Sequence, residues 1–375
     1  MKYYSLLTFF LYFSMGATLP LFSQYLQSIG LTGTEIGTIF SVGTFISILF
    51  QPFWGFMADR TNAIKKILIF LLIFSALTIS SIPFTKSFMI IAILYASYQF
   101  FTCGIFPLND AATLHSKYEF GRIRQWGSVG FATAAFISSI LAQYLSNNII
   151  FYITAFACII ALIFLNKIDA KSSHNETINL ALLKDLLKNK NYILFLIMAF
   201  FIGGTINANN TYFGLLYKHL GGTTSGIGFA FLLFALSEAP FLKNSDYIIK
   251  KFGVNKLLIF SGISFMLRWG IYSFIPSTKL ILILFLLQGL SIGTFLAGAA
   301  QYINLHTKKS QTATAITIYF SLSLGIGSML CIFLSGIIID KINIFAAYKF
   351  YLLWSAIGFS VLMYLYYSLK KQNHR

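Results

Sequence analysis

Long apolar stretches that are almost free of charge constrain this chain more than any other feature. We find twelve of them, and a helix of about 20 residues is long enough to cross the hydrocarbon core of a bilayer. Hydrophobic residues make up 57% of the 375 and charged residues only 10%, whereas soluble domains carry about 25% charged residues. The pattern therefore predicts an all-α membrane protein with twelve transmembrane helices.

The predicted spans fall into two sets of six. The first set lies near Tyr3–Leu26, Glu35–Met57, Ile67–Ile82, Phe88–Leu108, Gln125–Leu145 and Ile149–Leu165. The second set lies near Tyr192–Leu215, Ser225–Leu242, Leu257–Phe274, Leu280–Ile303, Ala313–Ile338 and Phe345–Tyr367. We expect an N-terminal half over residues 1–165, a polar, Lys-rich cytoplasmic linker over 166–191 and a C-terminal half over 192–375.

Four ionisable residues lie in or against these apolar stretches: Asp110, Arg124, Glu238 and Arg268. A charged side chain at the centre of a bilayer costs several kcal/mol, so such residues usually face a partner or a water-filled cavity. They commonly mark the path of a solute or a proton. The four residues therefore indicate a transporter.

The formal net charge is +17. Nucleic-acid binding is disfavoured because the basic residues are scattered through short connections instead of forming one soluble face. With the N-terminus inside, most of them fall on the cytoplasmic side, and few, such as Lys86 and Lys279, fall outside. This asymmetry follows the positive-inside rule and predicts that both termini are cytoplasmic.

The two predicted halves share an internal repeat. The stretch Gly33–Gly37, followed by Asp59, is similar to Thr224–Gly228, followed by Asp246. Repeats of this kind are typical of transporters whose halves are related by an axis along the membrane normal, with a substrate site between them at the midplane.

The stretch Gly55–Arg60, followed by Lys65, resembles the signature cytoplasmic loop of the major facilitator superfamily. A Gly at a tight turn and an Asp near a helix end, paired with a basic residue, can hold two helices in one state. Gly55, Asp59, Arg60 and Lys65 are therefore candidate gating residues. The alternative is a charged turn that is merely solvated.

A second resemblance covers most of the chain. The stretches Pro107–Asp110, Tyr118–Gly130, Leu236–Pro240 and Met266–Gly270 resemble motifs of the 3-phenylpropionate permease branch and, more distantly, of lactose permease, among the oligosaccharide/nucleoside proton symporters. The resemblance implies a bacterial inner-membrane protein that moves a small organic solute together with protons.

In that comparison Asp110 is the carboxylate that pairs with Arg124 of the fifth helix. An Arg fork can exchange a carboxylate for a sugar hydroxyl or a substrate carboxylate, so the pair can act as a substrate switch. The alternative is that both residues are hydrated at the cytoplasmic rim. Glu238 is a candidate substrate acceptor or proton site, and Arg268 either compensates its charge or holds an anionic substrate. The alternative for these two is a structural ion pair.

Gln288 stands where the related permeases carry a histidine, and it does not titrate near neutral pH. Proton coupling would then depend on Asp110 or Glu238. Asn207, Asn210, Trp126 and Trp269 are further candidates for the substrate site. Amides can equally join helices, and the indole rings can equally be packing residues.

We therefore expect a secondary active transporter that works by alternating access, with proton symport of an aromatic or other carboxylate preferred over a sugar or nucleoside. The alternatives are a proton-antiport exporter of drugs or metabolites, or a membrane sensor. No phosphate-binding Gly-x-x-x-x-Gly-Lys-Ser/Thr loop is present, the five histidines are dispersed and the three cysteines lack metal-ligand spacing. We expect no enzyme activity, no cofactor and no bound metal, and a monomer in the lipid bilayer.

Overall fold

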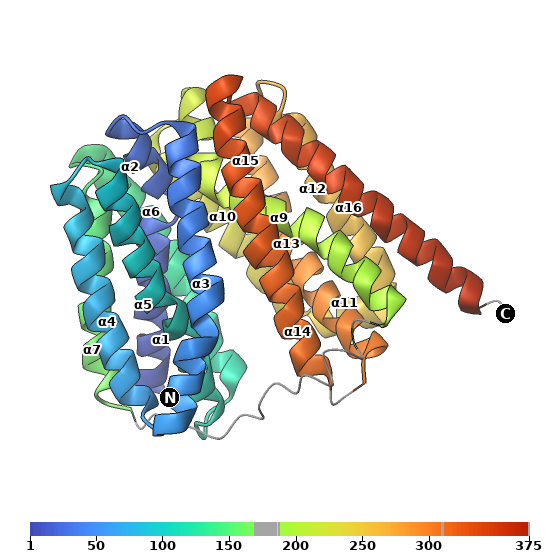
Figure 1. Cartoon of the computed structure of the whole chain (residues 1–375), viewed down its shortest axis with the longest axis horizontal. Coiled ribbons are helices and arrows are strands. Elements are labelled where there is room, and N and C mark those ends of the chain that lie inside the picture. Colours follow the sequence, from blue (N-terminus) through green and yellow to red (C-terminus); the bar gives the residue numbers. More distant parts are fainter. Residues whose placement is uncertain (169–185, 187, 309–310, 374–375) are drawn as a thin grey trace. The chain divides into compact units, whose positions relative to one another are not determined.

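The computed structural model describes residues 1–168, 186, 188–308 and 311–373, and the elements of regular secondary structure in these ranges are helices (Figure 1). The first helices are α1 Lys2–Thr18, α2 Phe22–Ser28, α3 Gly33–Thr61, α4 Ile64–Ser81, the short η1 Ile82–Phe84, α5 Phe88–Leu114, α6 Phe120–Tyr144 and α7 Ile149–Leu165. The later helices are α9 Lys190–His219, α10 Thr224–Lys243, α11 Ser245–Phe252, α12 Val254–Tyr272, α13 Thr278–His306, α14 Thr312–Phe320, the π-helix η3 Ser321–Gly327, α15 Ser328–Lys341 and α16 Ile344–Asn373.

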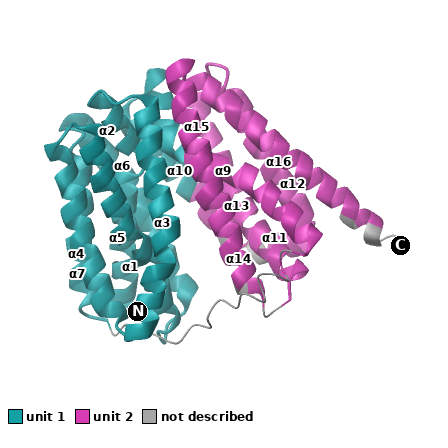
Figure 2. Cartoon of the chain, viewed as in Figure 1, with its two compact units in different colours: residues 1–176, 210–235 teal, residues 177–209, 236–375 magenta. Residues whose placement is uncertain are grey.

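Two compact units make up the chain (Figure 2). Unit 1 holds residues 1–176 and 210–235, and unit 2 holds residues 177–209 and 236–375. The boundaries between the units therefore fall inside α9 and α10. The two halves and the linker predicted from the sequence stay a prediction, and most of that linker lies outside the described residues.

Nine helical stretches among the described residues are long and apolar enough to cross a membrane. The helix Ile149–Leu165 is apolar but shorter. The helices α6 and α12, which carry Arg124 and Arg268, do not belong to this set. The chain is thus a helical protein with many apolar spans, and the count of exactly twelve stays a prediction.

The first predicted span is interrupted. The helix α1 ends at Thr18 and α2 begins at Phe22, with Pro20 in the turn between them. Proline has no backbone N–H and its ring clashes with the carbonyl four residues earlier, so it favours a break at this point. The whole stretch Lys2–Ser28 is nevertheless long and apolar enough to cross a membrane, in agreement with the predicted span.

Close contact between α1 and α6 depends on two glycines in unit 1. A Cβ on Gly16 would collide with the backbone of Phe131, and a Cβ on Gly130 would collide with the backbone of Phe9. Small residues allow membrane helices to approach this closely. The contact fixes α6, and with it Arg124, against α1.

Helices α3 and α5 are joined by Trp54. Its indole Nε1 donates a hydrogen bond to the carbonyl of Phe100 (2.8 Å), and its ring lies against Gly104. Trp54 belongs to a buried apolar cluster that also includes Leu71 and Ile105. This cluster supports α5 on the side of the chain that leads to Asp110.

A π-helical segment interrupts the predicted span Ala313–Ile338. It runs from Ser321 to Gly327, and a π-helix leaves carbonyl groups without their usual partners in the α-helical pattern. The side chain of Asn207 donates a hydrogen bond to the carbonyl of Leu324 (3.2 Å) and another to Oγ of Ser328 (3.1 Å). Asn207 on α9 therefore satisfies a backbone group that the π-helix exposes.

Candidate functional site

Unit 1 brings together three of the helices that carry candidate residues. Asp110 lies on α5, Arg124 on α6 and Tyr12 on α1. The Nε of Arg124 lies 3.8 Å from Oδ1 of Asp110, and the guanidinium lies 4.2 Å from the centre of the Tyr12 ring. An ion pair at this distance is looser than a hydrogen bond, and the ring of Tyr12 gives the guanidinium a second support.

The carboxylate of Asp110 can still accept a hydrogen bond. Its Oδ1 is buried and makes no hydrogen bond to the residues that the structure describes. Its side chain as a whole is 32% exposed, and that of Arg124 is 36% exposed. The pair is therefore partly accessible, and it can accept a proton or exchange its partner for a solute.

Gly127 makes room for this arrangement. A Cβ at this position would lie 2.7 Å from a ring carbon of Tyr12 and 2.9 Å from Nη1 of Arg124. Any larger residue would displace the guanidinium or the ring. The sequence motif around Trp126 and Gly127 thus positions Arg124 by leaving space beside it.

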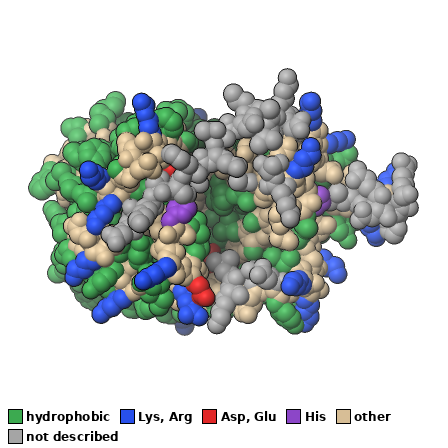
Figure 3. Space-filling model, turned by 90° about the horizontal axis from the view of Figure 1, so that it is seen from below, with side chains coloured by type: hydrophobic (Ala, Val, Ile, Leu, Met, Phe, Trp, Pro, Cys, Tyr) green, Lys and Arg blue, Asp and Glu red, His purple; other side chains and the backbone are tan. Residues whose placement is uncertain are grey.

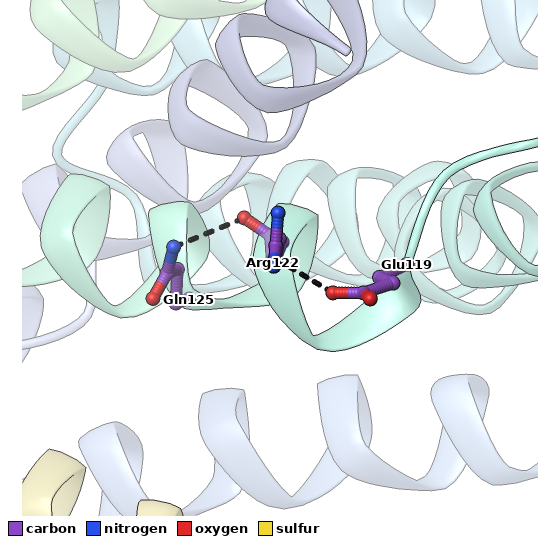
Figure 4. Close-up of polar contacts among 3 residues, drawn as sticks. All are labelled: Glu119, Arg122 and Gln125. Atoms are coloured by element: carbon purple, nitrogen blue, oxygen red, sulfur yellow. Dashed lines mark hydrogen bonds and ion pairs between the residues drawn. The ribbon is translucent and has the colours of Figure 1, made fainter.

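A second ion pair, at the beginning of α6, is different in kind (Figure 4). Arg122 Nε lies 2.6 Å from Oε2 of Glu119, and both side chains are mostly exposed, at 67% and 71%. Gln125 donates a hydrogen bond to the carbonyl of Arg122 (3.2 Å). Exposed pairs of this type contribute little to stability, so the looser and more buried Asp110–Arg124 pair is the stronger functional candidate.

Unit 2 contains a buried polar chain that joins four helices. Arg268 on α12 donates from Nη2 to Oε1 of Gln288 on α13, and Asn209 on α9 donates to the same oxygen (3.3 Å). The hydroxyl of Tyr348 on α16 donates to Oδ1 of Asn209 (3.2 Å). Each of the four side chains is at most 1% exposed. We name this chain of hydrogen bonds the Arg268 network.

Three aromatic rings enclose the guanidinium of Arg268. Its central carbon lies 4.6 Å from the ring of Trp269, 5.6 Å from Tyr272 and 6.0 Å from Phe285. Trp269 is held in turn by a hydrogen bond from its Nε1 to Oγ1 of Thr205 (3.2 Å). Cation–π contacts are strongest when water is excluded, so the rings stabilise the charge without neutralising it.

Two donor nitrogens of Arg268 are unused. Its Nε and Nη1 are buried and make no hydrogen bond to any residue within the described ranges. A buried donor without an acceptor carries its full desolvation cost. The site is therefore suited to a ligand that brings acceptor oxygens.

Glu238 does not pair with Arg268 in this structure. It lies on α10 and is partly buried, and its Cγ lies beside Gly293 of α13. Arg268 instead contacts the neutral amide of Gln288. Within the part of the chain that the structure describes, the hydrogen-bond acceptor next to the guanidinium thus comes from α13 and not from α10.

The remaining substrate-site candidates are dispersed. Trp126 is 42% exposed on α6, and Asn210 is partly buried on α9 within unit 1. Asn207 binds the π-helical segment, as described above. Asn209, which the sequence offered together with Asn207 and Asn210 as a residue that could line a cavity, belongs to the Arg268 network. Tyr12 in unit 1 and Tyr348 in unit 2 were not marked by any motif, since their roles depend on contacts between helices far apart in the sequence.

The candidate gating segment is mostly helical. Gly55, Asp59 and Arg60 lie inside α3, and Lys65 lies in the first turn of α4. The tight turn expected at Gly55 is made instead by Asn62, whose φ of 50° places it in the left-handed region. Asparagine tolerates this conformation well, which explains why Gly55 is not needed for the turn.

Lys65 binds the end of another helix. Its Nζ donates to the carbonyls of Asn166 (2.9 Å) and Ile168 (3.0 Å), which follow α7. The last carbonyls of a helix lack intrahelical partners and carry partial negative charge. Lys65 therefore ties the start of α4 to the end of α7.

Comparison with known proteins decides the family. A model described as the MFS_1 like family matches residues 2–350. The chain belongs to this major facilitator family. A maltose permease of Geobacillus stearothermophilus is 32% identical over 368 residues, which cover 96% of this chain and 93% of that protein. YwbF, an uncharacterized transporter of Bacillus subtilis (strain 168), is 32% identical over 95% of this chain and 91% of its own length.

The fold of this family member is also found in a solved structure. The crystal structure of the nucleoside transporter NupG aligns with a TM-score of 0.87 at 16% identity, over 97% of this chain and 98% of that one. At this identity the likeness concerns the fold alone. Because the family and its relatives are permeases, the chain is a membrane transporter and not an enzyme.

The sequence motifs predicted the superfamily correctly and the branch less well. The comparisons support a major facilitator transporter, with relatives named as maltose and lactose permeases, and do not support the 3-phenylpropionate branch. The arginine motif at Met266–Gly270 resembled both kinds of permease, so it could not separate them.

Proposed function

We propose that this protein is a secondary active transporter that carries a small organic solute together with protons by alternating access. The observation that carries the proposal is the Asp110–Arg124 pair, a carboxylate with a buried, unbonded oxygen at 3.8 Å from a guanidinium that rests on an aromatic ring. Such a pair can open when the carboxylate binds a proton.

The proposed cycle follows from this geometry. Protonation of Asp110 removes the charge that attracts Arg124, and the guanidinium, still supported by Tyr12, turns its donors to the solute. Release of the proton restores the pair and expels the solute. Glu238 is the second proposed proton site, because Gln288 cannot titrate in the place where related permeases carry a histidine.

We propose a sugar as the leading solute class. The maltose permease relative, at 32% identity over nearly the whole chain, supports this class. The amide and guanidinium groups of the Arg268 network suit hydroxyl-rich ligands as well, since both can hydrogen-bond to hydroxyl oxygens.

An aromatic or other carboxylate is the second candidate. The specific observation in its favour is the uncompensated charge of Arg268, whose Nε and Nη1 lack acceptors among the described residues. A substrate carboxylate would accept from both nitrogens and would neutralise the charge. The ring of Trp269 beside the guanidinium would suit a flat substituent.

The proposed topology has twelve spans in two halves, residues 1–165 and 192–375, with the linker 166–191 and both termini in the cytoplasm of a bacterial cell and the spans in its inner membrane. In its support, Arg60, Lys65, Lys117 and Arg122 fall in connections that this topology places in the cytoplasm, and Figure 3 shows Lys and Arg side chains on the surface of the described residues. Cytoplasmic surfaces of membrane proteins are enriched in these residues.

Solute counterflow in proteoliposomes tests the proposal. Vesicles loaded with unlabelled maltose, a nucleoside or 3-phenylpropionate are diluted into the same labelled solute, and transient accumulation identifies the transported class. We expect accumulation of maltose. Accumulation of 3-phenylpropionate alone, lost in Arg268→Gln, would establish the second candidate. Counterflow with none of these solutes would contradict both proposed classes.

A further inference from the structure

A polar cavity lies in unit 2, where α9 begins and α13 ends. It has a volume of about 590 Å³. The residues that line it include Lys188, Asn189, His306, Lys308 and Gln311. None of the residues of the Arg268 network belongs to this lining, so the cavity is not part of the proposed solute site.

The charge of this cavity has one sign. Two lysines and a histidine line it, and the described lining contains no carboxylate. Scattered lysines are expected on a cytoplasmic surface, but here they meet around a concave space. The combination favours an anionic ligand.

The beginning of α9 contributes to the same charge. Asn189 Oδ1 accepts from the backbone N–H groups of Asn191 (3.1 Å) and Tyr192 (3.2 Å), and its Nδ2 donates to the carbonyl of His306 (3.1 Å). Asn189 thus caps α9 and fixes it to the end of α13. The N-terminus of a helix of 30 residues carries partial positive charge that attracts phosphate groups.

Gln311 gives an independent indication of a ligand. Its side chain lines the cavity but is only 5% exposed. Its amide makes no hydrogen bond to any residue within the described part of the chain. Because the amide has a donor to spare and the residue lines the cavity, the phosphate oxygens of a ligand can accept a hydrogen bond from it.

We propose that this cavity binds a phosphate group, with Lys188 and Lys308 as its charge partners and Gln311 as a hydrogen-bond donor. A phosphodiester headgroup of an anionic phospholipid and soluble phosphate offer the same chemistry. Basic pockets between membrane helices on the cytoplasmic side are known to take anionic headgroups. This site is independent of the identity of the transported solute.

The test measures the thermal unfolding midpoint of the full-length protein in detergent. Phosphatidylglycerol, phosphatidylcholine and sodium phosphate are titrated separately at constant ionic strength. The double variant Lys188→Gln/Lys308→Gln is compared with Lys370→Gln/Lys371→Gln, which removes the same charge outside the cavity. We expect phosphatidylglycerol or phosphate, but not phosphatidylcholine, to raise the unfolding midpoint. The apparent affinity for the anion, taken from the titration, should fall about fivefold for each cavity lysine removed.

The two anions separate the two sources. Stabilisation by phosphate alone at millimolar concentration identifies a soluble ligand, and stabilisation by phosphatidylglycerol only identifies a lipid headgroup. The variant Gln311→Glu serves if the double variant does not fold, since its carboxylate would occupy the cavity and remove the anion response. No anion-specific stabilisation of the wild type, or equal losses in the two double variants, would overturn the proposal.

Discussion

Arg268 donates a hydrogen bond to Gln288, and both side chains are removed from solvent, at 0% and 1% exposure. The acceptor of a buried cation is thus a neutral amide, and the charge is stabilised by three aromatic rings instead of a carboxylate. Because the amide leaves the charge in place, Arg268 keeps the ability to attract a solute oxygen or anion.

Replacement of the acceptor tests this interpretation. We expect Gln288→Leu to lower the thermal unfolding midpoint, since a hydrogen bond to a charged group contributes about 1.5–3 kcal/mol. The control Gln301→Leu, on the same helix but partly exposed, should have little effect. Gln288→Glu should keep the stability and weaken binding of anionic solutes, measured by equilibrium binding of 3-phenylpropionate. Equal midpoints for Gln288→Leu and Gln301→Leu would contradict the assigned role.

The hydrogen bond from Trp269 to Thr205 gives a second prediction. Thr205→Val removes the acceptor of the indole Nε1 and keeps the shape of the side chain, so it should cost about 1–3 kcal/mol by leaving a buried donor unpaired. Thr205→Ser should retain the hydrogen bond and most of the stability. The tryptophan fluorescence spectrum, followed during thermal unfolding, measures both changes. If the Thr205→Val and Thr205→Ser variants have the same unfolding midpoint, the hydrogen bond does not position Trp269.

Much of the helical architecture was predictable because apolar length alone indicates a membrane helix. The exceptions have local physical causes. Pro20 lies in the turn that divides the first span into α1 and α2, and the π-helical segment at Ser321–Gly327 accepts a hydrogen bond from Asn207, which is distant in sequence. A hydrophobic pattern does not report which side chain will satisfy a released carbonyl, so this second interruption could not be predicted.

The candidate site was predictable in part for a similar reason. Charged residues in apolar stretches are conspicuous, and the structure brings Asp110 and Arg124 together. The support from Tyr12 and the choice of Gln288 over Glu238 as the neighbour of Arg268 depend on how the helices are rotated. Aromatic and amide side chains are common in membrane helices, so the sequence alone does not distinguish Tyr12 and Gln288 from other residues of the same type.

Helix contact in unit 1 gives a third prediction. Gly130→Val places side-chain atoms against the backbone of Phe9, and overpacking of this kind costs about 1–3 kcal/mol or more. We expect a lower yield of monodisperse protein and a lower unfolding midpoint. Gly55→Ala is the matched control, because a Cβ there meets nothing within 4 Å. Alanine is also more favourable than glycine inside a helix by about 1 kcal/mol. A destabilised Gly55→Ala beside a tolerated Gly130→Val would refute this packing argument.

The contact of Lys65 with the end of α7 gives a fourth prediction. Lys65→Met removes a cation from two terminal carbonyls, an interaction worth about 0.3–1 kcal/mol near a helix C-terminus. We expect faster protease cleavage just after α7, whereas Lys66→Met, at an exposed position on the same turn, should not change it. Identical cleavage rates for the two variants would show that Lys65 does not stabilise this helix end.

Proton movement driven by solute tests the central claim most directly. De-energised proteoliposomes containing wild-type protein, Asp110→Asn or Glu238→Gln are mixed with maltose or 3-phenylpropionate, and the external pH is recorded. We predict alkalinisation with the wild type and its loss in Asp110→Asn, whose amide cannot bind and release a proton. Solute uptake by the wild type without any pH change, or unaltered alkalinisation in Asp110→Asn, would contradict coupling through Asp110.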